Sequence, residues 1–268
     1  MRLWVLGSGS AGNATLLESN GTRVLIDAGF PPRVLATRLS QLGVPCDSIE
    51  AVVLTHEHHD HVRGACMSAA RWGWSLHATH GTIAALPELA TCGAQAFRAG
   101  DELALGDFAL RTHVVSHDAA EPVAVIATAR SSGTRAGIAY DLGRASESLR
   151  TQLCDLDLLV VETNHDVQRL RSGPYPAAVQ QRIASNLGHL SNEAGAELAA
   201  EAAHRGLAHV ILAHLSRRCN EPALALRAVR QALRATRFQG SVHAASQDRP
   251  CGPFRAGGHP DTQLALAL

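Results

Sequence analysis

The fold of this chain is decided by one stretch, Thr55-His56-Glu57-His58-His59-Asp60-His61. The apolar residues 51–54 precede it and have the length of a buried strand, so the polar cluster is expected in the loop at that strand's carboxyl end. Strand ends of this kind are where α/β sheets usually build their sites. On a tight loop, alternate side chains of the His-x-His-x-Asp-His pattern can serve two neighbouring metal ions, which a regular helix does not allow. The alternative is a solvated, histidine-rich surface loop.

Composition bounds the class of protein. The chain has 268 residues, of which 46% are hydrophobic, and this is enough for a large core. Its formal net charge is zero, so overall charge gives no reason to expect non-specific binding to nucleic acid or membranes. All 24 basic residues are arginine, and any basic side chain that contacts a phosphate is therefore a guanidinium, which suits bidentate binding.

The cysteines and the apolar stretches bear on the compartment. The six cysteines are scattered without a Cys-x-x-Cys pair, which argues against a zinc ribbon or a disulfide scaffold and fits a reducing compartment. The apolar residues 1–6 reach a glycine-rich turn too soon for a signal peptide, and no apolar stretch has membrane-spanning length. We therefore expect a cytoplasmic protein that does not act with a membrane. No pattern indicates an oligomeric state.

The order of elements predicts an α/β protein. Strands dominate up to residue 140, and after it helices at 145–153, 174–186, 191–203 and 222–234 alternate with strands at 156–161 and 208–212. The glycine-rich turn at 7–13 superficially matches a dinucleotide-binding loop, but a strand follows it rather than a helix, which disfavours that interpretation. We expect one domain over residues 1–246. Gly, Pro and Arg dominate residues 247–268, which predicts a poorly ordered tail.

Five chemically active side chains share one placement, just after apolar strands: His56, His117, Asp141, Glu162 and His214. A layered α/β fold gathers such strand ends at one edge, so we expect these residues to meet. Histidine and carboxylate ligands without cysteine fit zinc or manganese better than a structural zinc finger. Asp27 also ends a strand, and it is either a carboxylate that orients a ligand histidine or an ordinary turn residue.

These ordered motifs resemble those of the metallo-β-lactamase superfamily over nearly the whole chain. The resemblance implies an α/β fold, the metallo-β-lactamase αβ/βα four-layer sandwich, with two divalent metal ions, Zn²⁺ or Mn²⁺, at one edge. In this ligand set the first three residues would hold one ion, the next three the second, and the last would bridge them: His56, His58, His117, Asp60, His61, His214 and Asp141.

Within the superfamily, the chain is most similar to the YycJ/WalJ-like group of small nucleases, on residues 7–13, 116–122, 162–166 and 188–192. That group is linked with 5′-to-3′ exonuclease action on DNA. The resemblance therefore implies a dinuclear-metal-dependent phosphodiesterase that uses a metal-bridging hydroxide, with DNA rather than RNA as its partner. RNA processing is one alternative, and hydrolysis of a small thioester or lactone by the same pair of ions is another. A non-enzymatic metal-binding protein is the third.

The resemblance also suggests catalytic roles. Glu162 and His189 lie where tRNase Z carries its paired glutamate and histidine. His189, oriented by Glu162, is the candidate acid for the leaving oxygen, although a packing role at a helix start is the alternative. Asp60 is expected both to ligate metal and to handle a proton.

Candidate substrate contacts complete the site. They are His165, Ser216, Arg217, Arg218 and Asn220. The last four directly follow the last expected ligand and would hold a phosphate. Solvated surface arginines and a structural His165 are the alternatives. The sequence shows neither a β-CASP insertion between residues 141 and 214 nor a recognisable separate arm for gripping tRNA.

Overall fold

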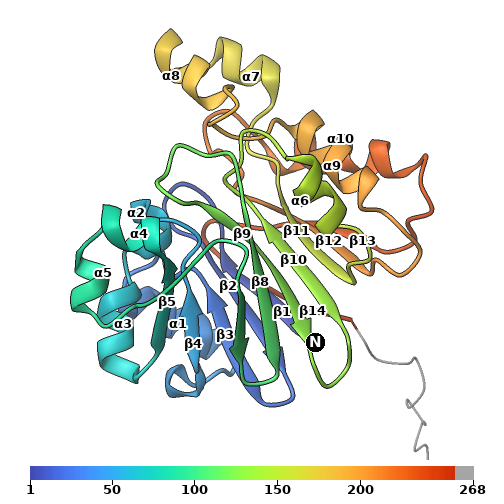
Figure 1. Cartoon of the computed structure of the whole chain (residues 1–268). Coiled ribbons are helices and arrows are strands. Elements are labelled where there is room, and N and C mark those ends of the chain that lie inside the picture. The colour runs from blue at the N-terminus through green and yellow to red at the C-terminus, as the bar shows by residue number, and fades with distance from the viewer. Residues whose placement is uncertain (257–268) are drawn as a thin grey trace, which may run out of the picture.

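The computed structural model describes residues 1–256, which form two seven-stranded mixed sheets packed face to face (Figure 1). The first sheet contains, in spatial order, β14 (Cys251–Arg255), β1 (Arg2–Gly7), β2 (Ala14–Ser19), β3 (Thr22–Ile26), β4 (Ala51–Val53), β5 (Ser75–Thr79) and β6 (Gln95–Phe97). The second contains β13 (Ser241–Ala244), β12 (His209–Ala213), β11 (Leu158–Glu162), β10 (Arg135–Ala139), β9 (Val123–Ala129), β8 (Phe108–Val114) and β7 (Glu102–Leu105).

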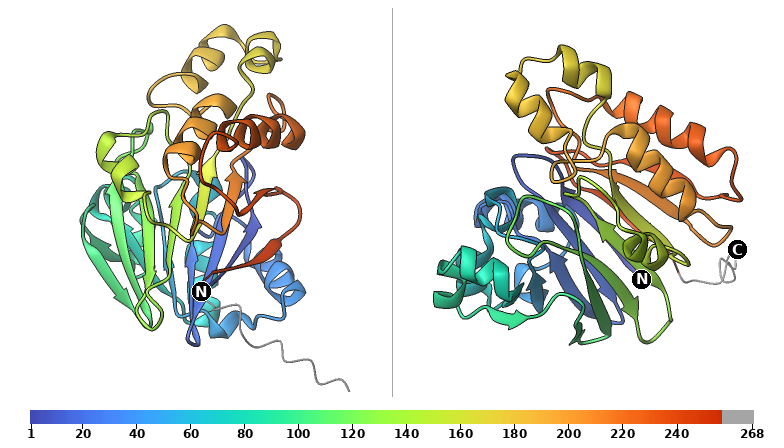
Figure 2. Two further views of the ribbon diagram at one scale, coloured as in Figure 1. Left: turned by 90° about the vertical axis from the view of Figure 1, so that its right-hand side faces the viewer. Right: turned by 45° about the horizontal axis from the view of Figure 1, so that its top comes forward.

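Helices cover the outer face of each sheet and complete the four layers (Figure 2). The first half of the chain contributes α1 (Pro32–Gln41), the 3₁₀ turn η1 (Cys46–Ser48), α2 (His59–Val62), α3 (Ala65–Trp72), α4 (His80–Ala85) and α5 (Glu88–Thr91), which lie between strands of the first sheet in the sequence. The second half contributes α6 (Glu147–Gln152), α7 (Val167–Ser172), α8 (Ala177–Ile183), α9 (Asn192–Glu201) and α10 (Pro222–Leu233). This architecture confirms the predicted αβ/βα sandwich.

Strand alternation explains how each sheet is buried on both faces. In β3, Val24 and Ile26 belong to the core between the sheets, whereas Leu25 packs with the residues under α1 and α3. Successive side chains of a strand point to opposite faces, so a strand with helices on one side and a sheet on the other is apolar throughout. The continuous apolar runs of the sequence follow from this double burial.

Parallel pairing gathers the functional strand ends. Strands β3 to β6 run parallel in the first sheet, as do β10 to β13 in the second. The carboxyl ends of β3 and β4 therefore share an edge, and so do those of β10, β11 and β12. Because the sheets stack, residues that follow these strands meet along one rim of the sandwich.

The expected disorder after residue 246 is wrong for residues 247–256. Strand β14 pairs antiparallel with β1, and Phe254 enters the core between the sheets. Gly252 and Pro253 are tolerated because β14 is an edge strand, where a missing backbone donor is harmless. Gln247 is buried, and its carbonyl accepts a hydrogen bond from Arg38 Nη2 at 2.9 Å. Residues 257–268 lie outside the described part of the chain.

The cysteines also required correction. Cys66 and Cys92, which are 26 residues apart, form a disulfide between α3 and the turn after α5. Sequence spacing could not reveal this pair because a disulfide depends on the spatial approach of two Cβ atoms. One reason for expecting a reducing compartment is thereby lost, and the cytoplasmic location stays a prediction. Among residues 1–256, no helix is both long and apolar enough to cross a membrane.

Candidate metal centre

The first ligand cluster joins the loop after β4 to the loop after β8. Ring nitrogens of His56, His58 and His117 lie within 4.8 Å of one another. Nδ1 of His58 is 3.2 Å from Nε2 of His117, close to the roughly 3.3 Å expected between two nitrogens on one tetrahedral zinc ion. Burial and the neighbouring His61 lower the pKa of His56 well below its usual value, which keeps this ring neutral as a metal ligand must be.

A second cluster lies beside the first and shares a carboxylate with it. Asp60 Oδ2 is 3.4 Å from His214 Nε2 and 3.5 Å from His61 Nε2. Between the clusters, Asp141 places one oxygen 2.5 Å from His61 Nε2 and the other 2.7 Å from His214 Nδ1. Burial opposes the charge of Asp141, but His214 and His61 outweigh it and hold the pKa of its carboxyl well below its usual value. The carboxylate is therefore ionised where both clusters can share it.

The residues fit a pair of divalent cations. Nε2 of His56 is buried without a hydrogen-bond partner, 3.9 Å from Asp141 Oδ2. The oxygens of Asp141 lie close to His61 and His214, but not in hydrogen-bonding geometry. Buried polar atoms almost always have partners, so this set of atoms fits bound cations between the rings and the carboxylate. The donors are imidazole nitrogens and carboxylate oxygens, which suit zinc or manganese.

The hydrogen bond at one nitrogen of each imidazole ring decides which nitrogen is available to a metal ion. His61 Nδ1 lies 2.7 Å from Asp27 Oδ2, and His117 Nδ1 lies 3.0 Å from the carbonyl of Gly188. Both partners can only accept, so Nδ1 is protonated in each ring and Nε2 is the nitrogen left for a metal ion. Thr55 Oγ1 donates its one proton to Asp27, so it accepts from His56 Nδ1 at 3.0 Å. Three imidazoles thus direct Nε2 towards the centre.

Asp27 is the anchor of this arrangement. Its buried carboxylate accepts hydrogen bonds from Thr55 N at 2.8 Å, Thr55 Oγ1 at 2.9 Å and Tyr140 Oη at 2.9 Å, besides that from His61. Of the two sequence alternatives for Asp27, this geometry matches the carboxylate that orients a histidine. Thr55 and Tyr140 did not emerge from the sequence, although each directly adjoins a predicted ligand.

Glu162, the last residue of β11, has a corresponding anchoring role in the second sheet. Its buried carboxylate accepts from the backbone of Leu142 and Leu190 at 3.0 and 3.2 Å, and Oε1 lies 2.8 Å from His189 Nδ1 and 3.0 Å from His214 Nδ1. Burial disfavours the charge of His189, but Glu162 outweighs it and raises the pKa of that imidazole to about 9. The neighbouring His189 in turn overcomes the effect of burial on Glu162 and lowers the pKa of its carboxyl to about 2.

Three non-glycine residues at the centre adopt left-handed backbone conformations. Asp27, Asp141 and His214 have φ values of 63°, 56° and 54°. Such a conformation costs about 1–2 kcal/mol for a residue with a side chain. Asp27 and His214 directly follow strands β3 and β12, and Asp141 lies two residues after the end of β10. Strain of this kind concentrates at functional sites, where surrounding contacts hold it.

Neighbouring loops close around the metal-ligand loop. Asn13 Nδ2 lies 3.2 Å from Asp60 Oδ2 and 3.0 Å from His61 Nε2, and its backbone N–H donates to the Asp60 carbonyl at 2.8 Å. Gly29 packs so tightly here that an added Cβ would lie 1.7 Å from that same carbonyl oxygen. Glu57 accepts from the backbone of Ala120 at 2.7 Å and so ties the two histidine loops together. The glycine-rich turn therefore serves the metal loop.

Comparisons with known proteins agree with this geometry. A family model described as the Metallo-beta-lactamase superfamily matches residues 7–135. Exodeoxyribonuclease YycJ of Bacillus anthracis is 31% identical over 238 residues, covering 87% of this chain and 89% of that protein. Exodeoxyribonuclease WalJ of Streptococcus pneumoniae (strain D39) is 32% identical over 227 residues, covering 82% and 84%. The chain belongs to the YycJ/WalJ-like group of the metallo-β-lactamase superfamily.

A solved structure of the superfamily extends the agreement on the fold. The metallo-beta-lactamase fold protein YhfI from Bacillus subtilis has a TM-score of 0.69 and 21% identity, covering 94% of this chain and 99% of that one. The metallo-β-lactamase fold therefore spans both sheets of the chain, beyond the residues that the family model matches.

The candidate substrate contacts of this chain differ in burial and in the hydrogen bonds that they already make. Asn220 is buried, and its amide nitrogen is engaged with the carbonyls of Thr163 and Asn164 and with Asn192 Oδ1, at 2.8, 3.0 and 2.8 Å. It has no donor left for a phosphate, so the structure makes it a scaffold residue and overturns its expected role. Ser216 is also buried, and its hydroxyl accepts from the backbone of the next turn.

The other candidates differ in exposure. Arg217 is exposed and forms an ion pair with Asp248. The Arg218 guanidinium lies 5.6 Å from the ring centroid of Tyr175. His165 is buried, and its Nδ1 has no hydrogen-bond partner. The two arginines remain proposals as phosphate contacts, and so does His165.

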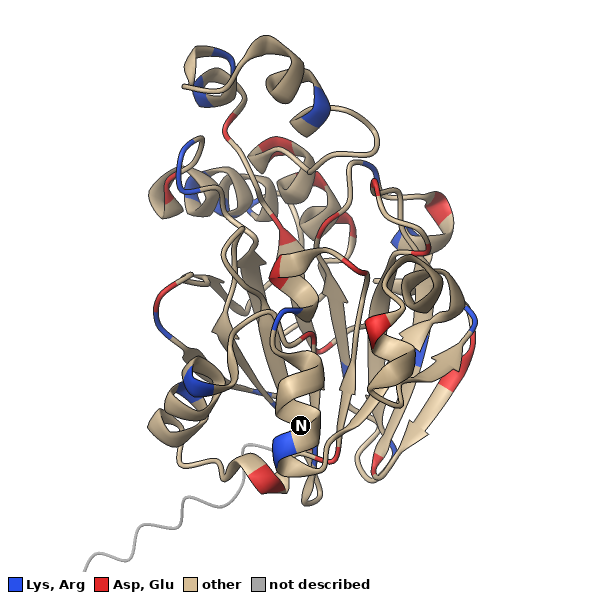
Figure 3. Cartoon of the chain, turned by 90° about the vertical axis from the view of Figure 1, so that its left-hand side faces the viewer, with Lys and Arg blue, Asp and Glu red and all other residues tan. Residues whose placement is uncertain are grey.

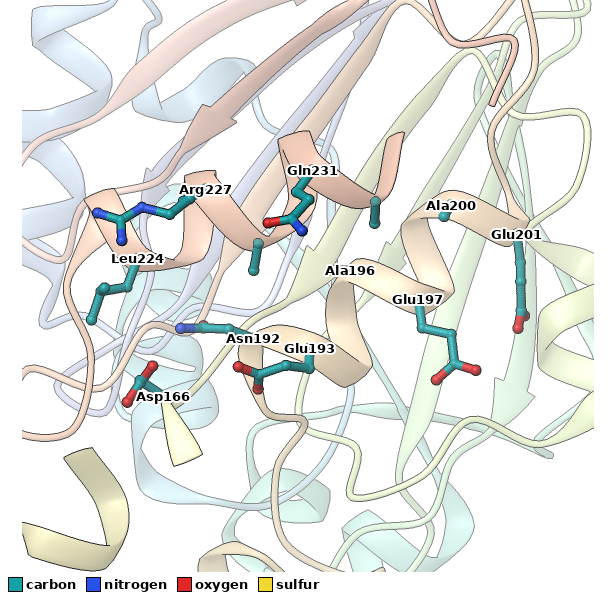
Figure 4. Close-up of a pocket in the computed structure, with 12 residues that line it drawn as sticks. Asp166, Asn192, Glu193, Ala196, Glu197, Ala200, Glu201, Leu224, Arg227 and Gln231 are labelled. Atoms are coloured by element: carbon teal, nitrogen blue, oxygen red, sulfur yellow. The ribbon is translucent and has the colours of Figure 1, made fainter. Parts of the chain in front are cut away.

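A cavity of about 770 Å³ lies away from the metal centre, along the groove between α9 and α10 (Figure 4). None of the candidate ligands lines it. Its charged lining consists of one arginine and four carboxylates: Arg227, Asp166, Glu193, Glu197 and Glu201. This excess of negative charge would repel a phosphodiester, so the rim with the metal ligands is the candidate active site.

Proposed function

We propose that this chain is an exodeoxyribonuclease that hydrolyses DNA from the 5′ end with two divalent metal ions, Zn²⁺ or Mn²⁺. As a member of its superfamily it is a metal-dependent hydrolase. One observation carries the proposal furthest: the buried carboxylate of Asp141 lies between two ligand clusters and groups with His56 of one and His61 of the other. The names of YycJ and WalJ, which this chain resembles over more than four fifths of its length, support DNA as the substrate.

In this proposal each cluster holds one ion. His56, His58 and His117 would bind the first, Asp60, His61 and His214 the second, and Asp141 both. Bound there, the ions supply a nucleophile from water near neutral pH and neutralise charge on the phosphate.

In this proposal His189 and Asp60 transfer the protons of the reaction. Glu162 occupies the Nδ1 side of His189, so the proton that His189 can deliver to the leaving oxygen is the one on Nε2. In the metal-free chain Glu162 and Asp141 raise the pKa of His189 to about 9, and the Glu162 bond would continue to favour its protonated form. Asp60, held by Asn13 at 3.2 Å, would ligate metal and accept a proton from the attacking water.

Digestion of end-labelled substrates tests this function. Single- and double-stranded DNA and RNA, each with a 5′-phosphate or 5′-hydroxyl, would be incubated with the full chain and Mn²⁺ or Zn²⁺. An Asp60→Ala, His61→Ala double variant controls for contaminating nucleases. Mononucleotide release from DNA by the wild type alone is the expected result.

The position of the label decides polarity. Early release of a 5′ label, with a slowly shortening 3′-labelled strand, is expected for 5′-to-3′ action. The reverse order contradicts the proposed polarity, and cleavage of RNA but not DNA contradicts the proposed substrate. If metal-loaded protein cleaves no nucleic acid but hydrolyses a thioester or lactone panel, the phosphodiesterase proposal falls.

A further inference from the structure

A pair of short helices projects beyond the two sheets. Residues 167–187, here called the arm, contain α7 and α8 and stand clear of the sandwich in Figures 1 and 2. No side chain of α8 is buried, and α7 buries only Leu170. The sequence predicts a helix over residues 174–186, and the structure has α8 within that range. Because the arm contributes almost nothing to the core, its residues are free to serve another purpose.

The arm carries positive charge only. It contains Arg169, Arg171 and Arg182 and no aspartate or glutamate. In Figure 3 every coloured position on the arm is basic. Arg169 pairs with Glu221 and Arg182 with Asp118, so a polyanion would bind here by competing with these two carboxylates for the arginines.

Arg182 connects the arm to the metal centre. Its Nε donates to Asp118 Oδ2 at 2.7 Å, and Asp118 Oδ1 lies 3.4 Å from Nε2 of His117 and 3.9 Å from Nε2 of His58. The Arg182 side chain is 69% exposed, so its guanidinium also faces solvent. Both Nε and Nη2 of Arg182 contact Asp118 Oδ2, and a phosphate that replaced this carboxylate would engage the same two donors.

The arm is fastened to the loop that contains His117. The Asp118 backbone N–H donates to the carbonyl of Leu187 at 3.1 Å, and Ser116 Oγ donates to that of Asn186 at 2.8 Å. These bonds place the end of the arm beside a ligand loop. A nucleic-acid strand bound along the arm would therefore lie next to the loop that contains His117.

The start of α8 offers a stacking surface. Tyr175, just before the helix, is partly exposed, and Arg218 packs over its ring at 5.6 Å. Aromatic rings and guanidinium planes bind unpaired bases by stacking, without regard to sequence. In contrast, the groove behind Asp166 is lined by carboxylates, which excludes a phosphate backbone from that side.

We propose that the arm holds the single strand of the DNA substrate, with Arg182 binding a phosphate beside the metal centre and Tyr175 with Arg218 stacking a base further along. Arg182 acts here as a positioning residue that exchanges Asp118 for the phosphate. The inference deepens the proposed nuclease function and rests on it for the chemistry. The binding of DNA, however, is measurable without any cleavage.

Binding is tested first, with a 5′-fluorescein-labelled 20-nucleotide single strand and the full chain in EDTA, which prevents cleavage. The variants are Arg182→Ala, Arg182→Ala with Arg218→Ala, and Tyr175→Ala. Arg205→Ala removes one exposed arginine outside the arm and is the matched control. We expect the double variant to bind at least about tenfold more weakly than wild type, and its log–log salt dependence to be shallower by about 0.7 for each lost phosphate contact. The control should bind as wild type does.

Kinetics separate positioning from folding. With Mn²⁺ present, the arm variants should raise KM for DNA more than they lower kcat, because they weaken binding and leave the metal ligands in place. The Arg205→Ala control should keep wild-type kinetics on both DNA and bis(p-nitrophenyl) phosphate. Arg182→Lys should recover part of the DNA affinity because it keeps the charge. Wild-type affinity and salt dependence in the double variant would overturn the proposal, as would equal weakening by Arg205→Ala.

The two proposals fail differently. If the wild type binds DNA through the arm but cleaves no nucleic acid, the arm inference stands and the nuclease function falls. If the wild type cleaves DNA and the arm variants bind and cleave it normally, the arm inference falls alone.

Discussion

Replacing Asp27 by asparagine should weaken metal binding through His61 without altering a ligand. Asp27 Oδ1 accepts from the backbone N–H of Thr55, so the amide oxygen of the substituted side chain must stay there. The amide NH₂ group then takes the place of Oδ2, facing His61 Nδ1 at 2.7 Å and Tyr140 Oη at 2.9 Å. The tyrosine hydroxyl can rotate and accept. His61 can accept at Nδ1 only by moving its proton to Nε2.

That proton occupies the lone pair with which His61 would bind a metal ion. Asp141 Oδ2, 2.5 Å away, would accept it and hold the wrong tautomer in place. Loss of such an orienting partner typically lowers metal affinity 10- to 100-fold, which is about 1.4–2.7 kcal/mol. Exchanging charge-assisted hydrogen bonds for neutral ones should also reduce the free energy of unfolding of the metal-free protein by about 1–2 kcal/mol.

Titration calorimetry of the metal-free protein with Zn²⁺, and unfolding in urea, measure the two effects. Tyr140→Phe is the matched control, because it removes a donor to the same oxygen and leaves the His61 bond intact. The control should lose about 1 kcal/mol of stability and retain its metal affinity. Unchanged affinity in Asp27→Asn, or an equal loss in Tyr140→Phe, would refute the tautomer argument.

Four further predictions follow from the same contacts. His189→Gln should lower kcat on DNA about 10²- to 10⁴-fold with metal content unchanged, and an unaffected kcat in steady-state assays would exclude it as the acid. Asn220→Ala leaves the carbonyl of Thr163 and the buried side-chain amide of Asn192 without partners, so urea unfolding should show a loss of about 2–4 kcal/mol; a loss below about 1 kcal/mol would contradict this. Zn²⁺ at about a hundred times its Kd should stabilise the chain by about 2.7 kcal/mol over the chelated form in the same assay, unless the clusters bind no metal. Burial raises the pKa of the Cys251 thiol to about 11, so folding favours the protonated thiol. The stability that this thiol contributes is therefore lost as the pH rises from about 9 to 11. Iodoacetamide at pH 8 should therefore alkylate it about a hundredfold more slowly in the native than in the urea-unfolded chain, as read by mass spectrometry; equal rates would show that the thiol is not shielded.

The placement of the candidate ligands could be predicted from the sequence because it depends on local order. An apolar run too short for a helix, followed by His56 or Asp141, identifies a strand end whatever the rest of the chain does. Alternating strands and helices then imply parallel pairing, which gathers those ends at one edge. The meeting of these residues thus follows from patterns a few residues long. Their division into two ligand sets came from the resemblance to the metallo-β-lactamase superfamily.

The prediction of a poorly ordered tail was wrong for residues 247–256, and the reason is physical. Gly252 and Pro253 oppose a central strand, and local composition cannot distinguish an edge strand from a disordered segment. The partner of β14 is β1, at the other end of the chain. Only the packed sandwich, with Phe254 in its core, makes that pairing favourable.

The sequence by itself determined the fold class, the metal-ligand loop and the strands that present the other candidate ligands, since these follow from local hydrophobic periodicity. Tertiary structure alone decided which nitrogen each histidine offers, because that depends on acceptors from distant segments, such as Gly188 for His117. It also brought Tyr140 to Asp27 across 113 residues, buried Asn220 in the scaffold and set Arg182 beside the ligand loop. Hydrogen bonds between segments so far apart form only after two sheets have packed, and no spacing in the chain records them.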